Sequence, residues 1–191
     1  MDAKQLFNRT LAQATVEVES VAPSDLDLAT PDNDWDVQAL VNHMLYQLVL
    51  VPEILSGKTM DEIGSKYDQD LIGIDLETSW NNAVQNALEA VDGCEMGSIS
   101  YSDLGSMQNS DYLSLTATDL LIHSWDLGIA IGRHVEFDPE VTKVIYAMSL
   151  PKKDDLYKTG LFAPPIPVSA SAPIQEKLLS IYGRDQASYK L

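Results

Sequence analysis

Apolar residues recur every three or four positions along most of the chain, a spacing that predicts amphipathic helices. Four long helices are expected at about residues 2–21, 36–56, 76–91 and 110–132, and two shorter ones at about 136–150 and 173–182. Asn33 or Asp34 can cap the second helix, and Asp138-Pro139 opens the fifth. Four long helices in a chain of 191 residues predict a mainly α protein, with a helical bundle as the leading architecture.

The segments between these helices carry loop signals. Residues 22–34 are rich in Asp, Pro, Ser and Thr, whereas residues 97–104 alternate loosely and are expected to form a short extended stretch. Residues 162–168 read Phe-Ala-Pro-Pro-Ile-Pro-Val and predict an extended, proline-rich segment before the last helix. The length suits one domain with its own core, and no repeat divides the chain, so residues 1–191 are expected to form a single helical domain.

The most informative stretch is Thr116–Gly132, which is apolar around most of the circumference of its predicted helix. A helix of this kind is usually buried. It nevertheless carries Asp119, His123 and Asp126, which are spaced four and then three residues apart and therefore share one face. Carboxylates in a core need a cation, hydrogen-bond donors or water. This polar stripe is the candidate functional site.

Composition and charge narrow the classes of function. Twenty-nine acidic against twelve basic residues give a formal charge of −17, which argues against nucleic-acid partners and against anionic membranes. The single cysteine, Cys94, excludes an internal disulfide framework and a multi-cysteine zinc site. The longest apolar run, Leu45–Leu55, is interrupted and too short to span a bilayer. The chain is therefore expected to be a soluble, cytoplasmic protein.

The chain has three histidines, and two of them fall inside predicted helices. Asp119 and His123 form an i, i+4 pair, a common way for one helix to offer two metal ligands. His43, on the second helix, is the candidate third ligand, which would leave positions open for water or substrate as in catalytic zinc sites. The competing interpretation is a hydrogen-bonded polar pair in the core. His134, in a polar connection, is expected at the surface.

Other polar and aromatic residues near the stripe leave alternatives open. Asp126 is a candidate second-shell residue that accepts the remaining ring N–H of a ligand histidine, or else it binds a backbone group or an arginine elsewhere. Trp35 and Trp125 are expected to be packing residues rather than walls of a substrate site. Arg184 is expected to pair with acidic residues of the bundle in a structural role.

Three motifs, in order, resemble a known family over residues 1–185. The first motif looks like the second-helix signature of the mycothiol-dependent maleylpyruvate isomerase-like proteins, which belong to the DinB-like superfamily. It consists of Thr30-Pro31, Trp35-Asp-Val37 and Leu40-Val-Asn-His43. Asp119-Leu-Leu-Ile-His123-Ser-Trp-Asp126-Leu resembles the fourth-helix motif of that group. The tail resembles that of a short, mostly uncharacterised metal-binding subfamily of this group. The similar residues are Phe162–Val168, Leu178-Leu179 and Gly183-Arg184-Asp185.

This resemblance implies a fold, a metal and a set of ligands. The fold would be a DinB-like up-down four-helix bundle with an additional C-terminal helix and a proline-rich extended tail. The metal ligands of the family map onto His43, Asp119 and His123, with Asp standing where the isomerases use Glu. Asp is one methylene shorter, so it can bind the metal differently or through water. A cysteine that often follows Thr-Pro in the family is absent, because Asp32 and Asn33 stand there instead.

The resemblance also implies a chemistry, in which a metal lowers the pKa of a small thiol such as mycothiol and the thiolate attacks an electrophile. The first hypothesis is therefore a thiol-dependent isomerase or S-transferase acting on a small electrophilic substrate. The second is a metal- or ligand-binding bundle without catalysis, and the third is a polar core network with no metal. Imidazole and carboxylate ligands suit Zn, Ni, Fe or Mn, with zinc as the default. The sequence identifies neither the substrate nor the oligomeric state.

Overall fold

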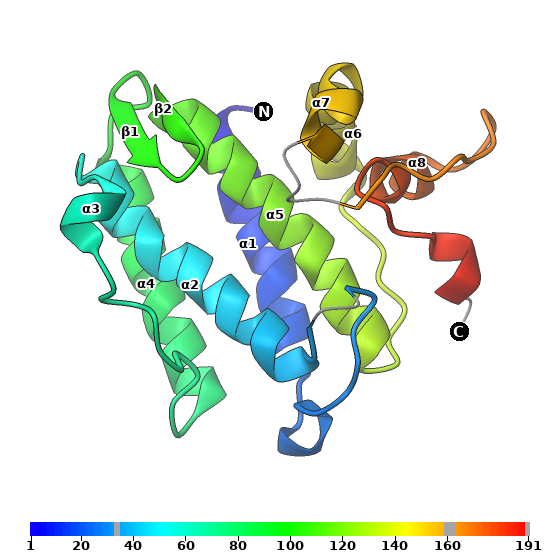
Figure 1. Ribbon diagram of the computed structural model, residues 1–191, viewed down its shortest axis with the longest axis horizontal. Helices are drawn as coiled ribbons and strands as arrows, with labels where there is room; N and C mark the ends of the chain where they lie inside the picture. The colour runs from blue at the N-terminus through cyan, green and yellow to red at the C-terminus, as the bar shows by residue number, and fades with distance from the viewer. Residues whose placement is uncertain (33–34, 159–162, 190–191) are drawn as a thin grey trace.

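The computed structural model describes residues 1–32, 35–158 and 163–189, and it is mainly helical (Figure 1). The four long helices are α1 (Ala3–Val18), α2 (Val37–Leu55), α4 (Leu76–Gly93) and α5 (Asn109–Ala130). The shorter helices are α3 (Met60–Ile63), α6 (Pro139–Ser149), α7 (Lys153–Lys158) and α8 (Ile174–Ile181). The strands are β1 (Ile99–Ser102) and β2 (Gly105–Gln108). Asn33, Asp34 and Phe162, which entered the sequence predictions, lie outside the described residues.

The four long helices pack side by side, and each contacts two of the others: α1 packs on α5 and α4, and α2 packs on the same two helices. Aspartates begin most of them, since a carboxylate can accept from the free N–H groups of the first turn. Asp2 caps α1, Asp36 caps α2 and Asp75 caps α4. The cap of α2 is therefore Asp36 rather than the expected Asn33 or Asp34. Asp138 caps α6 with Pro139 at its first position, as predicted.

The order of helix directions differs from the simple up-down alternation that the resemblance implies. The connection after α2 runs back along that helix: Lys66 and Tyr67 bind Glu53 near its end, whereas Leu71 donates its N–H to Asn42 near its start. The helix α4 begins there, so α2 and α4 run in the same direction (Figure 1). The up-down prediction is wrong at this step. The connection between α2 and α4, residues 56–75, is long enough to return along the whole length of α2 before α4 begins.

The helix α5 is the most buried element of the bundle. Every residue from Leu120 to Gly128 is buried, as the apolar circumference of this stretch predicts. A Cβ on Gly128 would lie 2.2 Å from Cγ2 of Val135 and 3.0 Å from Oε2 of Glu17, so the glycine makes room for the connection after α5 and for the Glu17 side chain of α1. The helix ends at Ala130, and Gly132 adopts a φ of 76°, the left-handed conformation typical of a glycine that follows a helix.

The expected extended stretch at 97–104 is half of a hairpin. The strands β1 and β2 pair antiparallel from Ile99 opposite Gln108 to Ser102 opposite Gly105. The pattern of β2 was too short to predict a strand, although Gly105, with a φ of 98°, marks the turn. Within the described residues, no helix is both long and apolar enough to cross a membrane.

The C-terminal part lies against the outside of the four long helices. The helix α8 packs on α6, and the side chain of Gln175 binds backbone groups of Val135 and Phe137 in the connection after α5. Residues 163–168 form no regular helix or strand, and Ile166 donates its N–H to the carbonyl of Ser180 at 2.9 Å. Further along, the ring of Tyr189 packs edge-on against that of Trp125 on α5, with the ring centroids 5.7 Å apart.

Candidate metal centre

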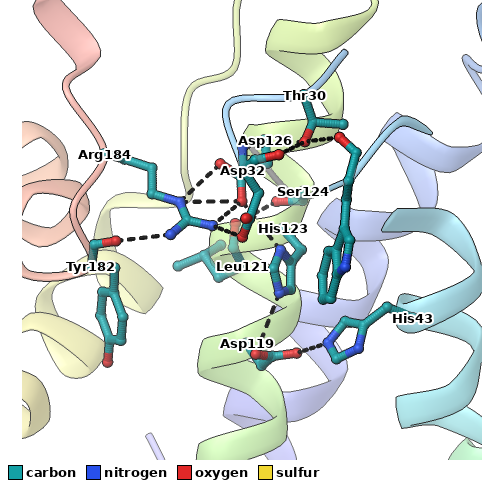
Figure 2. A network of polar contacts seen from close by, with 11 residues as sticks. Thr30, Asp32, His43, Asp119, Leu121, His123, Ser124, Asp126, Tyr182 and Arg184 are labelled. Carbon is teal, nitrogen blue, oxygen red and sulfur yellow. Dashed lines mark hydrogen bonds and ion pairs between the residues drawn. The ribbon is translucent and has the colours of Figure 1, made fainter. Parts of the chain in front are cut away.

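The packing of α2 against α5 brings His43, Asp119 and His123 together (Figure 2). Oδ2 of Asp119 lies 3.1 Å from Nε2 of His43, and Oδ1 lies 3.5 Å from Nε2 of His123. One candidate ligand atom from each of the three residues lies within 4.8 Å of the other two. The i, i+4 spacing on α5 aligns Asp119 with His123, and the tertiary contact between the helices adds His43.

The donor set matches the requirements of a divalent metal. Two imidazole nitrogens and one carboxylate oxygen are the ligand types of catalytic zinc sites. Ligands about 2.1 Å from zinc in a tetrahedron lie roughly 3.4 Å from one another. The separations between Asp119 and each imidazole, 3.1 and 3.5 Å, are close to that spacing. The two separations involve different oxygens of Asp119, and one atom from each of the three residues lies within 4.8 Å of the other two, so the side chains would close in on a bound ion.

The cluster is partly exposed to solvent. The His123 side chain is 9% exposed, whereas the side chains of His43 and Asp119 are 24% and 21% exposed. Water can therefore reach His43 and Asp119, whereas His123 is nearly enclosed. Three protein ligands, two of them partly exposed, are compatible with the open coordination of catalytic sites.

The charges in the cluster are strongly coupled. Burial opposes ionisation of Asp119, but the adjacent imidazoles of His123 and His43 outweigh it and hold the pKa of Asp119 well below its usual range. Burial likewise lowers the pKa of His123, but the carboxylates of Asp119 and Asp126 reverse that effect and raise the pKa to about 10. The imidazole of His123 is therefore protonated at neutral pH when no metal replaces its proton.

Asp126 makes both kinds of contact considered for it, one with the ring nitrogen of a candidate ligand histidine and one with an arginine. Its Oδ2 lies 3.2 Å from Nδ1 of His123, on the side of the ring away from Asp119. Arg184 also binds it, with Nε 3.0 Å from Oδ1 and Nη2 2.7 Å from Oδ2 (Figure 2). Asp126 has no exposed surface, and burial opposes its charge, but His123 and Arg184 keep its pKa below the usual range. It is an ionised carboxylate in the core, held between two cations.

Sequence reasoning missed the position of Trp35. Its ring centroid lies 4.6 Å from that of His43 and 5.5 Å from that of His123, so the indole covers both candidate ligands. The sequence signals for Trp35 are its place in the Trp35-Asp-Val37 motif and its position shortly before the helix that carries His43. Trp125, in contrast, is buried in the core as predicted, and His134 is exposed near Glu136 as predicted.

Comparison with known proteins adds no relative. No protein-family model matches the chain, and neither the curated proteins nor the solved structures gave a match. The functional interpretation therefore depends on the site itself and on the motifs in the sequence.

Proposed function

We propose that this protein binds one divalent metal ion, zinc by ligand type, through His43, Asp119 and His123. The observation that carries the proposal is the convergence of these three donor groups within 4.8 Å. The charges around them support it. Arg184 binds the carboxylates of Asp32 and Asp126, whereas the carboxylate of Asp119 lies against the imidazoles of His43 and His123. In the metal-bound state, in which both imidazoles are neutral, three carboxylates against one guanidinium leave two negative charges. A divalent cation offsets that charge.

We further propose that the protein belongs to the DinB-like superfamily and acts as a thiol-dependent isomerase or S-transferase on a small electrophile. A divalent metal at such a site lowers the pKa of a bound thiol and so supplies a nucleophile at neutral pH. The partial exposure of His43 and Asp119 is the route by which a small thiol would reach the metal. Cys94 is a poor source of the thiolate, because burial raises its pKa and it lies beyond the end of α4. The thiol would therefore come from a separate molecule, such as mycothiol.

Metal content tests the first part of the proposal. Purified protein, dialysed against zinc and then against metal-free buffer, should retain about one zinc per chain. The variant His123→Ala should retain none, whereas the control His134→Ala, which changes an exposed histidine, should match the wild type. Zinc absent from the wild type, or equal retention by His123→Ala, would contradict the proposed site.

Activity tests the second part and separates it from a non-catalytic metal-binding bundle. The zinc-loaded protein is incubated with mycothiol or glutathione and a panel of small electrophiles, among them cis-configured unsaturated acids and haloaromatic compounds. The proposal predicts thiol-dependent turnover that His43→Ala abolishes. Stoichiometric zinc without turnover on the panel would favour the alternative function, binding without catalysis.

A further inference from the structure

The C-terminal segment supplies a group to the interior of the site. Arg184 follows Gly183, which has a φ of 76° and whose Cβ, if present, would lie 2.5 Å from that of Ala163. This turn directs the arginine away from α8 and toward the end of α5 (Figure 2). There its side chain is only 7% exposed, and Nη1 donates to the carbonyl of Tyr182 at 2.9 Å. A turn that only glycine tolerates and a buried guanidinium indicate a defined position rather than a surface ion pair.

The guanidinium contacts carboxylates from two other parts of the chain. It binds both oxygens of Asp126, and Nη2 also donates to Oδ2 of Asp32 at 2.9 Å. Asp32 lies in the loop before α2, close in sequence to Trp35, whose ring covers His43 and His123. Arg184 thus connects the C-terminal segment to α5 and to the loop that covers the candidate ligands.

The contacts continue from Arg184 to a candidate ligand. Asp126 contacts Nδ1 of His123 on one side of the ring, and Nε2 on the other side faces Asp119. A carboxylate at Nδ1 fixes the proton there and leaves the lone pair of Nε2 for a metal. We propose that Arg184 is a positioning residue of the metal centre: it fixes the carboxylate of Asp126, which in turn fixes the ring of His123. This inference rests on the proposed metal site.

Arg184 affects the strength of His123 as a metal ligand in two opposite ways. Its positive charge weakens the pull of Asp126 on the Nδ1 proton, so removing the arginine while keeping the geometry would make His123 a stronger ligand. However, without Arg184 the buried carboxylate of Asp126 loses the hydrogen bonds to both of its oxygens that fix its orientation. The acceptor that orients the ring of His123 is then no longer held in place. The loss of orientation should therefore dominate, and metal affinity should fall.

Zinc affinity of the full-length protein, measured by competition with a chromophoric chelator, tests this role. Outer-shell partners of metal ligands typically contribute about 10–100-fold to affinity. We expect Arg184→Gln to weaken zinc binding about tenfold or more, and Arg184→Lys to fall between this variant and the wild type, because an ammonium cannot span both oxygens of Asp126. The matched control is Arg133→Gln, which breaks a 2.8 Å ion pair with the buried carboxylate of Glu17 outside the site and should leave zinc affinity unchanged.

A double-variant cycle and a spectrum distinguish positioning from a purely structural role. If Arg184 acts through Asp126, the double variant Asp126→Asn/Arg184→Gln should bind zinc no more weakly than Asp126→Asn alone. The visible absorption of the Co²⁺-loaded protein should change in Arg184→Gln and not in Arg133→Gln, with folding verified by circular dichroism. If Arg184→Gln does not fold, Arg184→Lys serves in the same comparisons.

The outcomes separate the two proposals. In one outcome the wild type binds zinc, and both Arg184 variants keep the wild-type affinity and an unchanged cobalt spectrum. This result would overturn the positioning role and leave the metal site intact. Failure of the wild type to bind zinc would overturn the proposed function and this inference with it.

Discussion

Oδ2 of Asp119 on α5 lies 3.1 Å from Nε2 of His43 on α2, although the two residues are 76 positions apart in the chain. This contact joins the two helices at the candidate metal centre. Asp119 is also the only one of the three candidate ligands that carries a negative charge, so it controls both the charge balance and the attachment of His43.

Asp119→Asn should abolish tight metal binding. The amide keeps the shape of the side chain but replaces an anionic ligand by a weak neutral one. The dissociation constant for zinc should therefore rise by more than the roughly 10–100-fold typical of outer-shell partners. The control Asp111→Asn removes an exposed carboxylate from the first turn of the same helix and should have no effect. Equal zinc affinity in the two variants would exclude Asp119 as a ligand.

Trp35 should contribute to metal affinity by restricting the two imidazoles. Aromatic contacts of this kind contribute about 0.5–1.5 kcal/mol, which corresponds to a 2- to 10-fold weaker zinc affinity in Trp35→Ala. Trp35→Phe keeps a ring over His43 and should lose less. Chelator competition gives both constants, and identical affinities in the wild type and Trp35→Ala would show that the indole does not orient the ligands.

The sequence predicted what depends on local spacing and missed what depends on long-range packing. The four long helices follow from apolar periodicity, and the shared face of Asp119 and His123 follows from the geometry of one helix. His43 is the third candidate ligand because it is the other histidine inside a predicted helix, and the family resemblance agrees with that choice; periodicity itself says nothing about which helices touch. The pairing of Arg184 with acidic residues is confirmed, but the identity of its partners, Asp32 and Asp126, and the ring contacts of Trp35 required the tertiary structure. The parallel course of α2 and α4 was missed for the same reason.

Zinc binding should release about one proton per metal near pH 7.5. Burial alone would lower the pKa of His123, but Asp119 and Asp126 raise it to about 10, so the metal-free ring is protonated and must lose the Nε2 proton to bind. Apparent affinity should then rise with pH, about tenfold per unit below that pKa. Calorimetry in two buffers of different ionisation enthalpy measures the release. Buffer-independent enthalpies would contradict the assigned protonation.

The carboxylate of Glu53 should stabilise the fold without affecting the metal centre. It accepts from Lys58, Lys66 and Tyr67, and these bonds lower its pKa from 4.5 to about 2. Glu53→Gln should therefore lower the free energy of unfolding at pH 7 by about 1–2 kcal/mol, a value reduced by the solvent that screens both half-exposed lysines. Zinc affinity should not change, because Glu53 lies near the far end of α2 from His43.

The pH dependence of this effect has a defined sign. A folded-state pKa below the ordinary value gives stability that is present above pH 4.5 and is lost as the pH falls toward 2. Urea denaturation of the metal-free proteins should therefore show the gap between wild type and Glu53→Gln at pH 7 and a smaller gap at pH 3. A gap of the same size at both values would mean that the ionised carboxylate is not the source.

Anomalous diffraction at the zinc absorption edge, from crystals of the zinc-loaded protein, tests the metal site most directly. We expect one strong peak between Nε2 of His43, Nε2 of His123 and the carboxylate of Asp119, with metal–ligand distances of about 2.0–2.2 Å. Crystals of His123→Ala grown under the same conditions should lack it. A zinc peak elsewhere on the molecule, with none among these three residues, would contradict the account.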